Sequence, residues 1–400
     1  MRITALTRGL AALMMLSGSL VVAQGVTAAA AHPVVAPAVV APQALAGAKA
    51  KDLTAGENHN CAVTTKGKVR CWGLNSVGQL GNNTMTNSNV PVEVVGLSKV
   101  KAVSAGYGHT CALTTSGKVY CWGYNAQGQL GNNTLVDSKV PVQVLGIAKV
   151  KSLSTGWYHS CAVTTKGAAK CWGYNSSGQL GNGATVNAPL PVQVSGLTKK
   201  VKSTNAGYGH TCALTTAGKV KCWGDNFYGQ LGTNNNTNVN TPAAVYNLAK
   251  SKSMKAGAFS TCAITTKGAA KCWGYNANGQ LGNNTLTHAK APTGVTGLSK
   301  KVKLIAPGYL HTCALTTSGK AKCWGDNSYG GLGNNTLTDS KVPVTVSGLA
   351  KSKDLGTGLY TSCALTTSSK VKCWGYNGIG AVGNGTNTDA KMPVSVVSLP

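Results

Sequence analysis

Short runs of alternating hydrophobic and polar residues follow one another along most of the chain, with turns rich in Gly and Asn between them. In residues 99–144, the runs KVKAVSAG, HTCALTT, KVYCWG and VPVQV each have the length and the Val, Leu, Thr and Tyr content of a β-strand. The Asn/Gly-rich loop YNAQGQLGNNTLVDSK separates the third run from the fourth. No amphipathic helix pattern occurs after residue 31. The pattern predicts units of four short antiparallel strands.

This four-strand unit recurs at intervals of about 50 residues, which is typical of propeller blades and not of helical solenoids. Its first cysteine marks seven copies: Cys61, Cys111, Cys161, Cys212, Cys262, Cys313 and Cys363. We therefore expect an all-β, seven-bladed β-propeller of four-stranded antiparallel blades over residues 49–400. Two modes of ring closure stay open, because residues 393–400 can complete the last blade or pair with the first, with residues 41–49 contributing.

Each unit has a second cysteine ten positions after the first, across a predicted hairpin. In TTSGK, a three-residue loop with Gly117 in the left-handed conformation pairs Thr114 with Lys118, and therefore Cys111 with Cys121. Opposed Cα atoms in such a pair lie roughly 4.5 Å apart, within the range for a disulfide. Zinc is the alternative, but the spacing fits no usual zinc finger. The same register predicts seven disulfides: Cys61–Cys71, Cys111–Cys121, Cys161–Cys171, Cys212–Cys222, Cys262–Cys272, Cys313–Cys323 and Cys363–Cys373. In the last unit Ser369 replaces the glycine, which predicts a strained or different turn.

Three other residue types recur in the unit. A Trp follows each second cysteine, and we expect it to pack against one adjoining blade while the disulfide faces the other. A His precedes the first cysteine by two positions in five units, and we expect it to hold its own turn to the backbone, since blades radiate and equivalent side chains cannot share one metal ion. The Asn of CWG-x-N is expected to hydrogen-bond within its loop.

The unit G-x-x-H-T/S-C-A-L/V/I-T-T-x-G-x-x-x-C-W-G-x-N-x-x-G-Q-L-G resembles the regulator of chromosome condensation repeat, most clearly in residues 106–131. The resemblance covers about residues 49–400 and implies a seven-bladed β-propeller. Members of this family include the exchange factor of a nuclear GTPase, a plant ultraviolet photoreceptor and secreted bacterial inhibitors of β-lactamase. The cysteine pairs depart from the general motif and fit an exported variant. The uniform spacing leaves no room for the exchange factor's inserted wedge, so a guanine-nucleotide exchange role has only family analogy in its favour.

The first 31 residues have the features of a secretory signal peptide: Arg2 and Arg8, an apolar stretch at 10–23 and small residues at 27–31. Residues 32–48, rich in Ala, Pro and Val, are expected to be a spacer. The apolar stretch is short for a membrane span, and no longer one follows. We therefore expect a secreted or cell-envelope-associated monomer without a transmembrane span in its mature chain, whose 14 cysteines form disulfides in an oxidising compartment.

Positive charge is abundant and unevenly distributed. The chain has 37 Lys and Arg against 9 Asp and Glu, a net charge of +28. Most lysines precede the first strand of a unit, or lie in the hairpin turn or third strand, and these segments share one rim of a propeller. The long loops hold only four: Lys139, Lys290, Lys341 and Lys391. This predicts one strongly basic rim, which either binds anions or keeps the protein soluble.

The chain shows no pattern of a catalytic site. Its few acidic residues form no repeated pair, the GNNT loops lack the acids that calcium needs, and neither a phosphate-binding loop nor a Ser/His/Asp pattern is apparent. We expect no enzyme activity, no cofactor and no metal. Nucleic acid is disfavoured as a partner, because the repeated Trp belong to the core, no nucleic-acid-binding motif occurs, and export removes most targets.

We therefore expect a binding scaffold that takes a partner protein on one rim, for example to inhibit a secreted enzyme. Tyr and Trp are favoured anchors in such surfaces. The expected contacts are the aromatic residues of the weakly charged rim: Tyr107, Trp157, Tyr158, Tyr208, Phe259, Tyr309 and Tyr360. The alternative is a carbohydrate or an anionic cell-envelope polymer, bound at repeated sites or by the basic rim. A structural role in a cell or spore coat also stays open.

Overall fold

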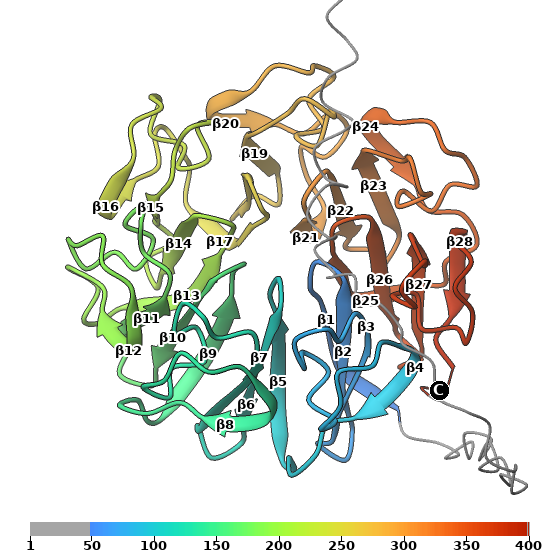
Figure 1. Cartoon of the computed structure of the whole chain (residues 1–400). Coiled ribbons are helices and arrows are strands. Elements are labelled where there is room, and N and C mark those ends of the chain that lie inside the picture. Colours follow the sequence, from blue (N-terminus) through green and yellow to red (C-terminus); the bar gives the residue numbers. More distant parts are fainter. Residues whose placement is uncertain (1–48, 398, 400) are drawn as a thin grey trace, which may run out of the picture. The chain divides into compact units, whose positions relative to one another are not determined.

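The computed structural model describes residues 49–397 and residue 399, which form seven four-stranded antiparallel β-sheets (Figure 1). Each sheet consists of four consecutive strands, so the predicted seven-bladed β-propeller is confirmed. Of the two modes of closure, the structure shows the first, since residues 390–395 form the fourth strand of the last sheet. The expected signal peptide at 1–31 and spacer at 32–48 lie outside the described residues.

The strands are nearly equal in length in all seven sheets. The first strands are β1 (Ala50–Ala55), β5 (Val100–Ala105), β9 (Val150–Thr155), β13 (Val201–Ala206), β17 (Ser251–Ala256), β21 (Val302–Pro307) and β25 (Ser352–Thr357). The second strands are β2 (His59–Thr64), β6 (His109–Thr114), β10 (His159–Thr164), β14 (His210–Thr215), β18 (Ser260–Thr265), β22 (His311–Thr316) and β26 (Thr361–Thr366). The third strands are β3 (Val69–Gly73), β7 (Val119–Gly123), β11 (Ala169–Gly173), β15 (Val220–Gly224), β19 (Ala270–Gly274), β23 (Ala321–Gly325) and β27 (Val371–Gly375). The fourth strands are β4 (Ser88–Glu93), β8 (Ser138–Gln143), β12 (Ala188–Gln193), β16 (Val239–Ala244), β20 (Ala289–Gly294), β24 (Ser340–Thr345) and β28 (Ala390–Ser395).

The seven sheets close into a ring around their first strands. Each first strand contacts the first strands of the neighbouring sheets, and β1 contacts β5 on one side and β25 and β26 on the other (Figure 1). These strands line a central cavity of about 330 Å³. The fourth strand of each sheet is therefore the outermost.

The hairpin between the second and third strands has the predicted register. Cys111 lies opposite Cys121, with Leu113 opposite Val119, and the other six hairpins pair in the same way. All seven predicted disulfides are present, with Cα atoms 4.0–4.1 Å apart. Ser369 keeps the same turn as Gly117 at a φ of 66°, so this turn is strained and not different.

The tryptophans and disulfides fill the spaces between blades, as expected. All seven repeated Trp side chains are fully buried. Trp122 of the second blade packs with Val63 and Leu80 of the first, whereas the Cys111–Cys121 disulfide packs with Trp172 of the third. The core of the protein is therefore a series of interfaces between blades.

A polar clasp accompanies each tryptophan. The indole Nε1 of Trp122 and the hydroxyl of Thr110 both donate to the main-chain carbonyl of Gln79 in the preceding blade, at 2.9 Å. Because the Thr110 proton is used in this way, its oxygen accepts from Nε2 of His59, at 2.7 Å. The expectation that the histidine holds its own turn is therefore wrong: its side chain reaches the next blade.

The clasp explains the GQLG motif and its variants. The acceptor is a main-chain carbonyl, so Gly331 and Ala381 serve as well as Gln in the sixth and seventh blades. The last glycine has a separate role, because a Cβ on Gly81 would lie 2.6 Å from the Trp122 indole nitrogen. The repeated asparagine acts within its own loop, as expected: Asn125 donates to the carbonyls of Thr134 and Val136 and accepts from the backbone nitrogen of Leu130.

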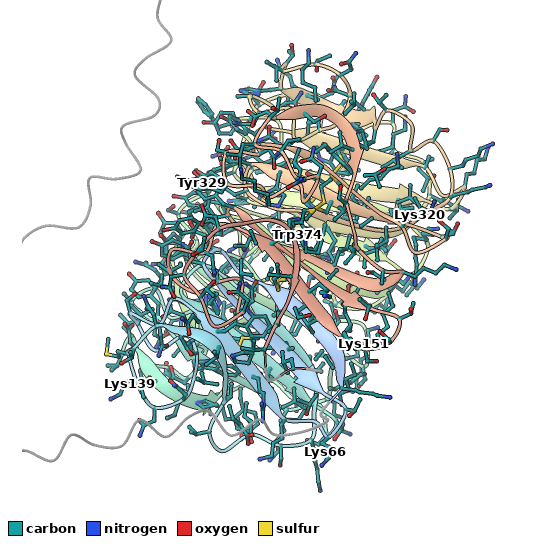
Figure 2. The ribbon with its side chains drawn as sticks, turned by 90° about the vertical axis from the view of Figure 1, so that its right-hand side faces the viewer. Lys66, Lys139, Lys151, Lys320, Tyr329 and Trp374 are labelled. Carbon is teal, nitrogen blue, oxygen red and sulfur yellow. A yellow bond between two sulfur atoms is a disulfide. The ribbon has the colours of Figure 1, made fainter. Side chains whose placement is uncertain are left out.

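Lysines dominate one rim. Figure 2 shows Lys66, Lys151 and Lys320 toward one side of the ring, with Lys139 and Tyr329 toward the opposite side. The hairpin turns and the links between blades form the first side, which we call the basic rim. The turns between first and second strands and the long loops after the third strands form the opposite side, which we call the aromatic rim.

Candidate binding site at the aromatic rim

Seven equivalent turns meet at the mouth of the central cavity on the aromatic rim. Each turn follows a first strand and begins with a glycine, and the residue after this glycine occupies the same position in all seven blades. These residues are Glu57, Tyr107, Trp157, Tyr208, Ala258, Tyr309 and Leu359. Backbone hydrogen bonds join neighbouring turns, for example from Glu57 N to the carbonyl of Gly106, and from Leu359 N to the carbonyl of Glu57. The mouth is thus a ring of side chains on a fixed backbone.

Trp157 is the centre of an aromatic network at this mouth. Its ring centroid lies 4.7 Å from that of Tyr208, 5.1 Å from that of Tyr107 and 5.4 Å from that of Tyr309. The contact with Tyr309 joins the third blade to the sixth, and the two rings are nearly parallel, with an interplanar angle of 16°. Trp157 therefore spans the ring instead of packing only against its neighbours.

The structure brings together six of the seven aromatic residues predicted as contacts. Tyr158 and Phe259 join the network through Tyr107, Trp157 and Tyr208. Tyr360 lies apart, in a second group with Tyr329 and Tyr376. Whether these side chains bind a partner stays a prediction.

Sequence reasoning missed the outer part of the network. Tyr124, Tyr174, Tyr228 and Tyr275 contact the predicted residues from the long loops. Three of them occupy the position directly after CWG, which was available as a signal, since Tyr stands there in four of the seven units. The network therefore extends outward over the long loops of the second to fifth blades.

Sequence reasoning also missed Glu57. It occupies the column that holds Tyr or Trp in four other blades, and it lines the central cavity with Trp157 and Tyr309. Its Oε2 atom is buried without a hydrogen-bond partner. Burial raises the pKa of Glu57 to about 8.

Charged groups also lie deeper in the cavity. Asp52 and Asp354, from β1 and β25, line it together with Lys255 from β17. Burial raises the pKa of Asp354 to about 6, against the lowering effect of Lys255, and raises that of Asp52 as well. The cavity thus holds three carboxyl groups and one ammonium group.

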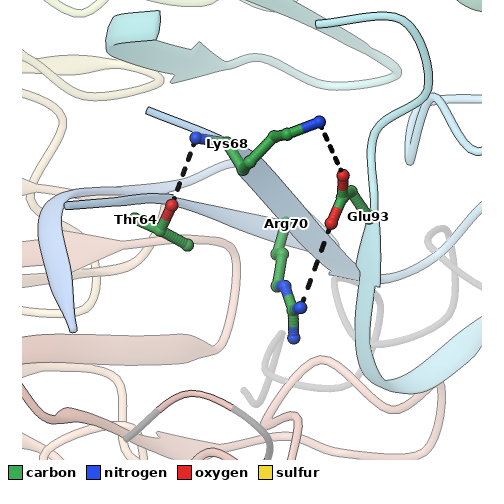
Figure 3. Close-up of polar contacts among 4 residues, drawn as sticks. All are labelled: Thr64, Lys68, Arg70 and Glu93. Atoms are coloured by element: carbon green, nitrogen blue, oxygen red, sulfur yellow. Dashed lines mark hydrogen bonds and ion pairs between the residues drawn. The ribbon is translucent and has the colours of Figure 1, made fainter. Parts of the chain in front are cut away.

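The basic rim is largely without acidic partners. Glu93 forms ion pairs with Lys68, at 3.1 Å, and Arg70, at 3.9 Å, while the backbone nitrogen of Lys68 donates to Thr64 (Figure 3). Nine acidic residues cannot pair with 37 basic ones, so most of the lysines have no acidic partner. Two lysine positions recur in every blade. These are Lys49, Lys99, Lys149, Lys200, Lys250, Lys301 and Lys351, and Lys51, Lys101, Lys151, Lys202, Lys252, Lys303 and Lys353.

Residues 49–397 and 399 contain neither a helix able to cross a membrane nor a cluster of metal-binding side chains. No helix in this part of the chain has the length and hydropathy of a membrane span. Within the same residues, no three His, Cys, Asp or Glu side chains form a group suited to a metal ion.

Family comparisons agree with the repeat and the ring. The model of the RCC1-like domain matches residues 23–306, and models of the regulator of chromosome condensation (RCC1) repeat match residues 302–330, 353–380 and 318–365. The chain belongs to the RCC1-like domain family. Among curated proteins, human E3 ubiquitin-protein ligase HERC2 is 43% identical over 53 residues, which are 13% of this chain and 1% of HERC2.

Solved structures share the fold. Human WBSCR16 has a TM-score of 0.70 and 24% identity, with 78% of this chain and 85% of that protein covered. Yeast RCC1 (Prp20), in a crystal structure with Kap60 bound, has a TM-score of 0.75 and 19% identity, with 95% and 91% covered. At these identities the likeness shows the propeller architecture alone.

Proposed function

We propose that this chain is a secreted, monomeric, non-enzymatic scaffold that captures a partner protein on its aromatic rim. The aromatic network around Trp157 carries the proposal, because clustered Trp and Tyr side chains are the usual anchors of protein interfaces. Exposed aliphatic side chains in the long loops extend the same rim: Met85, Leu135, Leu286 and Leu337. Apolar groups gathered on one face favour a protein partner.

The relatives support a binding role at the level of the fold. Yeast Prp20, which shares the propeller fold, has binding properties toward Gsp1p and histones and is bound by Kap60 in a crystal structure. Inhibition of a secreted enzyme is one use of such a rim. The seven disulfides and the full burial of their sulfurs fit a protein that works outside the cell.

Affinity capture with matched baits tests the proposal. Wild-type protein, Trp157→Ala and Tyr246→Ala are each used to capture proteins from culture supernatant and cell envelope, with mass spectrometry as the readout. Tyr246 is the control, since it is an exposed aromatic residue in a link between blades, away from the aromatic rim. A partner retained by wild type and Tyr246→Ala but lost with Trp157→Ala supports the proposal. Partners that bind all three baits equally contradict it.

A second function, binding of an anionic polymer of the cell envelope, is favoured by the two lysine positions that recur in all seven blades. Such repeats give many weak and equivalent sites along a polymer. Retention on heparin should then fall steeply with salt, and should weaken in Lys101→Gln/Lys303→Gln but not in Lys139→Gln on the opposite rim. Elution of wild type at low salt would count against this function.

A further inference from the structure

The central cavity has the opposite charge to the protein around it. Among its lining residues, the charged ones are Asp52, Glu57, Asp354 and Lys255. Three of the nine acidic residues of a chain with a net charge of +28 therefore face one cavity. A volume of about 330 Å³ is sufficient for a small organic group. Its charge complements a cationic ligand.

Glu57 is the least satisfied of these carboxyl groups. Asp52 accepts a hydrogen bond from the backbone nitrogen of Val103, and Asp354 from that of Leu355. Oε2 of Glu57 is fully buried and has no such partner. Removing a carboxylate from water without a donor is costly, and an ammonium group beside it would supply the missing donor and the counter-charge.

The approach to Glu57 is aromatic. Trp157 and Tyr309 line the same cavity, and Tyr107 occupies the neighbouring position in the ring at its mouth. Aromatic surfaces pack well against aliphatic chains, and cations are attracted to ring faces. Most lysines lie on the opposite rim, as Lys66, Lys151 and Lys320 do in Figure 2, and among the charged residues that line the cavity only Lys255 is cationic, against three carboxyl groups.

We infer that the central cavity binds an alkylammonium ligand whose ammonium group lies against Glu57 and whose aliphatic chain runs past Trp157 and Tyr309. Two sources share this chemistry: a free polyamine, and a lysine side chain of a partner protein. If the ligand is a free polyamine, the inference stands independently of the proposed function. If it is a lysine side chain of a partner protein, the inference rests on the proposed function and names the group that the rim recognises.

Binding couples to the protonation of Glu57. Its pKa of about 8 means that the carboxyl group is mostly protonated at pH 7 and must lose its proton to pair with the ligand. The tyrosines that face it are Tyr107, Tyr158, Tyr208, Tyr309 and Tyr360, whose pKa values burial raises, so they stay neutral throughout this range. Lys255, Asp52 and Asp354 lie in the same cavity, and burial raises the pKa of Asp354 to about 6, so Asp354 also gains negative charge in the lower part of this range. Affinity should therefore rise between pH 6 and pH 8, with release of a proton on binding.

Isothermal titration calorimetry on the disulfide-intact protein tests the inference. The probes are spermidine and a capped Gly-Gly-Lys-Gly-Gly peptide, with the acetyl-lysine peptide as the neutral control. We expect saturable binding of at least one charged probe, a loss of about tenfold or more in Glu57→Gln, and no saturable binding of the acetylated peptide. Asp339→Asn is the matched control. Asn stands at the equivalent position in other blades, as Asn87 does, and each accepts the same backbone hydrogen bond.

The calorimetric results distinguish the two ligand sources and show which outcome overturns the inference. Binding of spermidine alone identifies a free amine as the ligand, and binding of the lysine peptide identifies a protein side chain. Absence of both, or equal binding by wild type and Glu57→Gln, overturns the inference. If Glu57→Gln does not fold, the wild-type pH profile decides, and an affinity unchanged from pH 6 to pH 8 overturns it. None of these results depends on capture of a partner, so the proposed function is tested separately.

Discussion

The indole nitrogen of Trp72 donates a hydrogen bond to the main-chain carbonyl of Ala381, 309 residues later in the chain, over 3.0 Å. Asn60 donates to the same carbonyl from its side chain, at 2.7 Å. The other six blades have the same contact, as between Trp223 and the carbonyl of Gln179, at 2.9 Å. The same clasp therefore joins the first blade to the last and each of the other blades to its neighbour. The ring closes without a β-sheet that is shared between the two ends of the chain.

The first prediction follows from this equivalence. Trp72→Phe and Trp223→Phe each remove one indole donor and part of a buried ring, so each should lower the free energy of unfolding by about 2–4 kcal/mol. Because both carbonyls keep a second donor, Asn60 or Thr211, the two losses should be similar. Urea unfolding measures them. A much smaller loss in Trp72→Phe would mean that the closing interface is not an equal part of the cooperative unit.

The second prediction concerns the one hairpin without glycine. Ser369 adopts a φ of 66°, a conformation that costs a residue with a Cβ about 1–2 kcal/mol. Ser369→Gly should therefore stabilise the protein by about 0.5–1 kcal/mol, after loss of the hydrogen bond from Lys353 to the serine hydroxyl. Gly319→Ser, at the same position one blade earlier, should destabilise it by a similar amount. Thermal unfolding of the pair checks the sign.

A third prediction addresses the disulfides. Each closes a loop with a sequence separation of 10, and in the chain-entropy model this is worth about 2–3 kcal/mol. Cys212→Ala/Cys222→Ala should lower the stability by about this amount without opening the other six bridges. Since the cysteines are fully buried and paired, a thiol reagent should detect no free thiol in the folded wild-type protein. Labelling of native protein would contradict the pairing.

The hairpin and the core were predictable because each rests on short-range spacing. The separation of Cys111 and Cys121 and the position of Gly117 together allow only one register, and strand alternation then places Trp122 and the disulfide against opposite neighbours. The structure adds that Trp122 faces the preceding blade. The clasp was not predictable, because His59 bonds to Thr110, 51 residues away, and the final acceptor is a main-chain atom of Gln79. No side-chain pattern encodes such a partner.

Six of the aromatic residues of the candidate site could be predicted to share one rim, but their arrangement could not be predicted. The turn positions identified Trp157 and Tyr309 as aromatic residues of one rim, but their contact across the ring depends on its radius, which no local pattern reveals. Glu57 was overlooked because it occurs once, and repeat analysis favours what recurs. The acidic cavity could not be predicted from the sequence, because its carboxyl groups come together only once the first strands lie around a common axis.

Buried titratable groups of two kinds act on stability in opposite directions with pH. Burial lowers the pKa of His59, His109, His159 and His210 to about 3 and that of His311 to about 4. Between those values and about 6.5 the unfolded chain binds more protons at these positions, so stability falls as the pH falls. Burial raises the pKa of Glu57 to about 8 and that of Asp354 to about 6, so these groups make stability fall as the pH rises toward those values.

The fourth prediction is a stability maximum near pH 7, where the opposite effects of the histidines and the carboxyl groups on stability are about equal, with an acid limb below it and an alkaline limb above it. Below it the five histidines dominate, each contributing a slope of up to about 1.4 kcal/mol per pH unit, against the smaller number of carboxyl groups. His210→Ser, which copies the natural Ser260, should make the acid limb shallower. Above about pH 7 Glu57 is the main one of these groups that still changes its charge in the folded protein, because Asp354 is by then mostly ionised, so Glu57→Gln should flatten the alkaline limb and leave the acid limb steep. Urea unfolding at half-unit steps from pH 4 to pH 8 measures both slopes. An alkaline limb that persists in Glu57→Gln would show that this carboxyl group is already ionised at neutral pH.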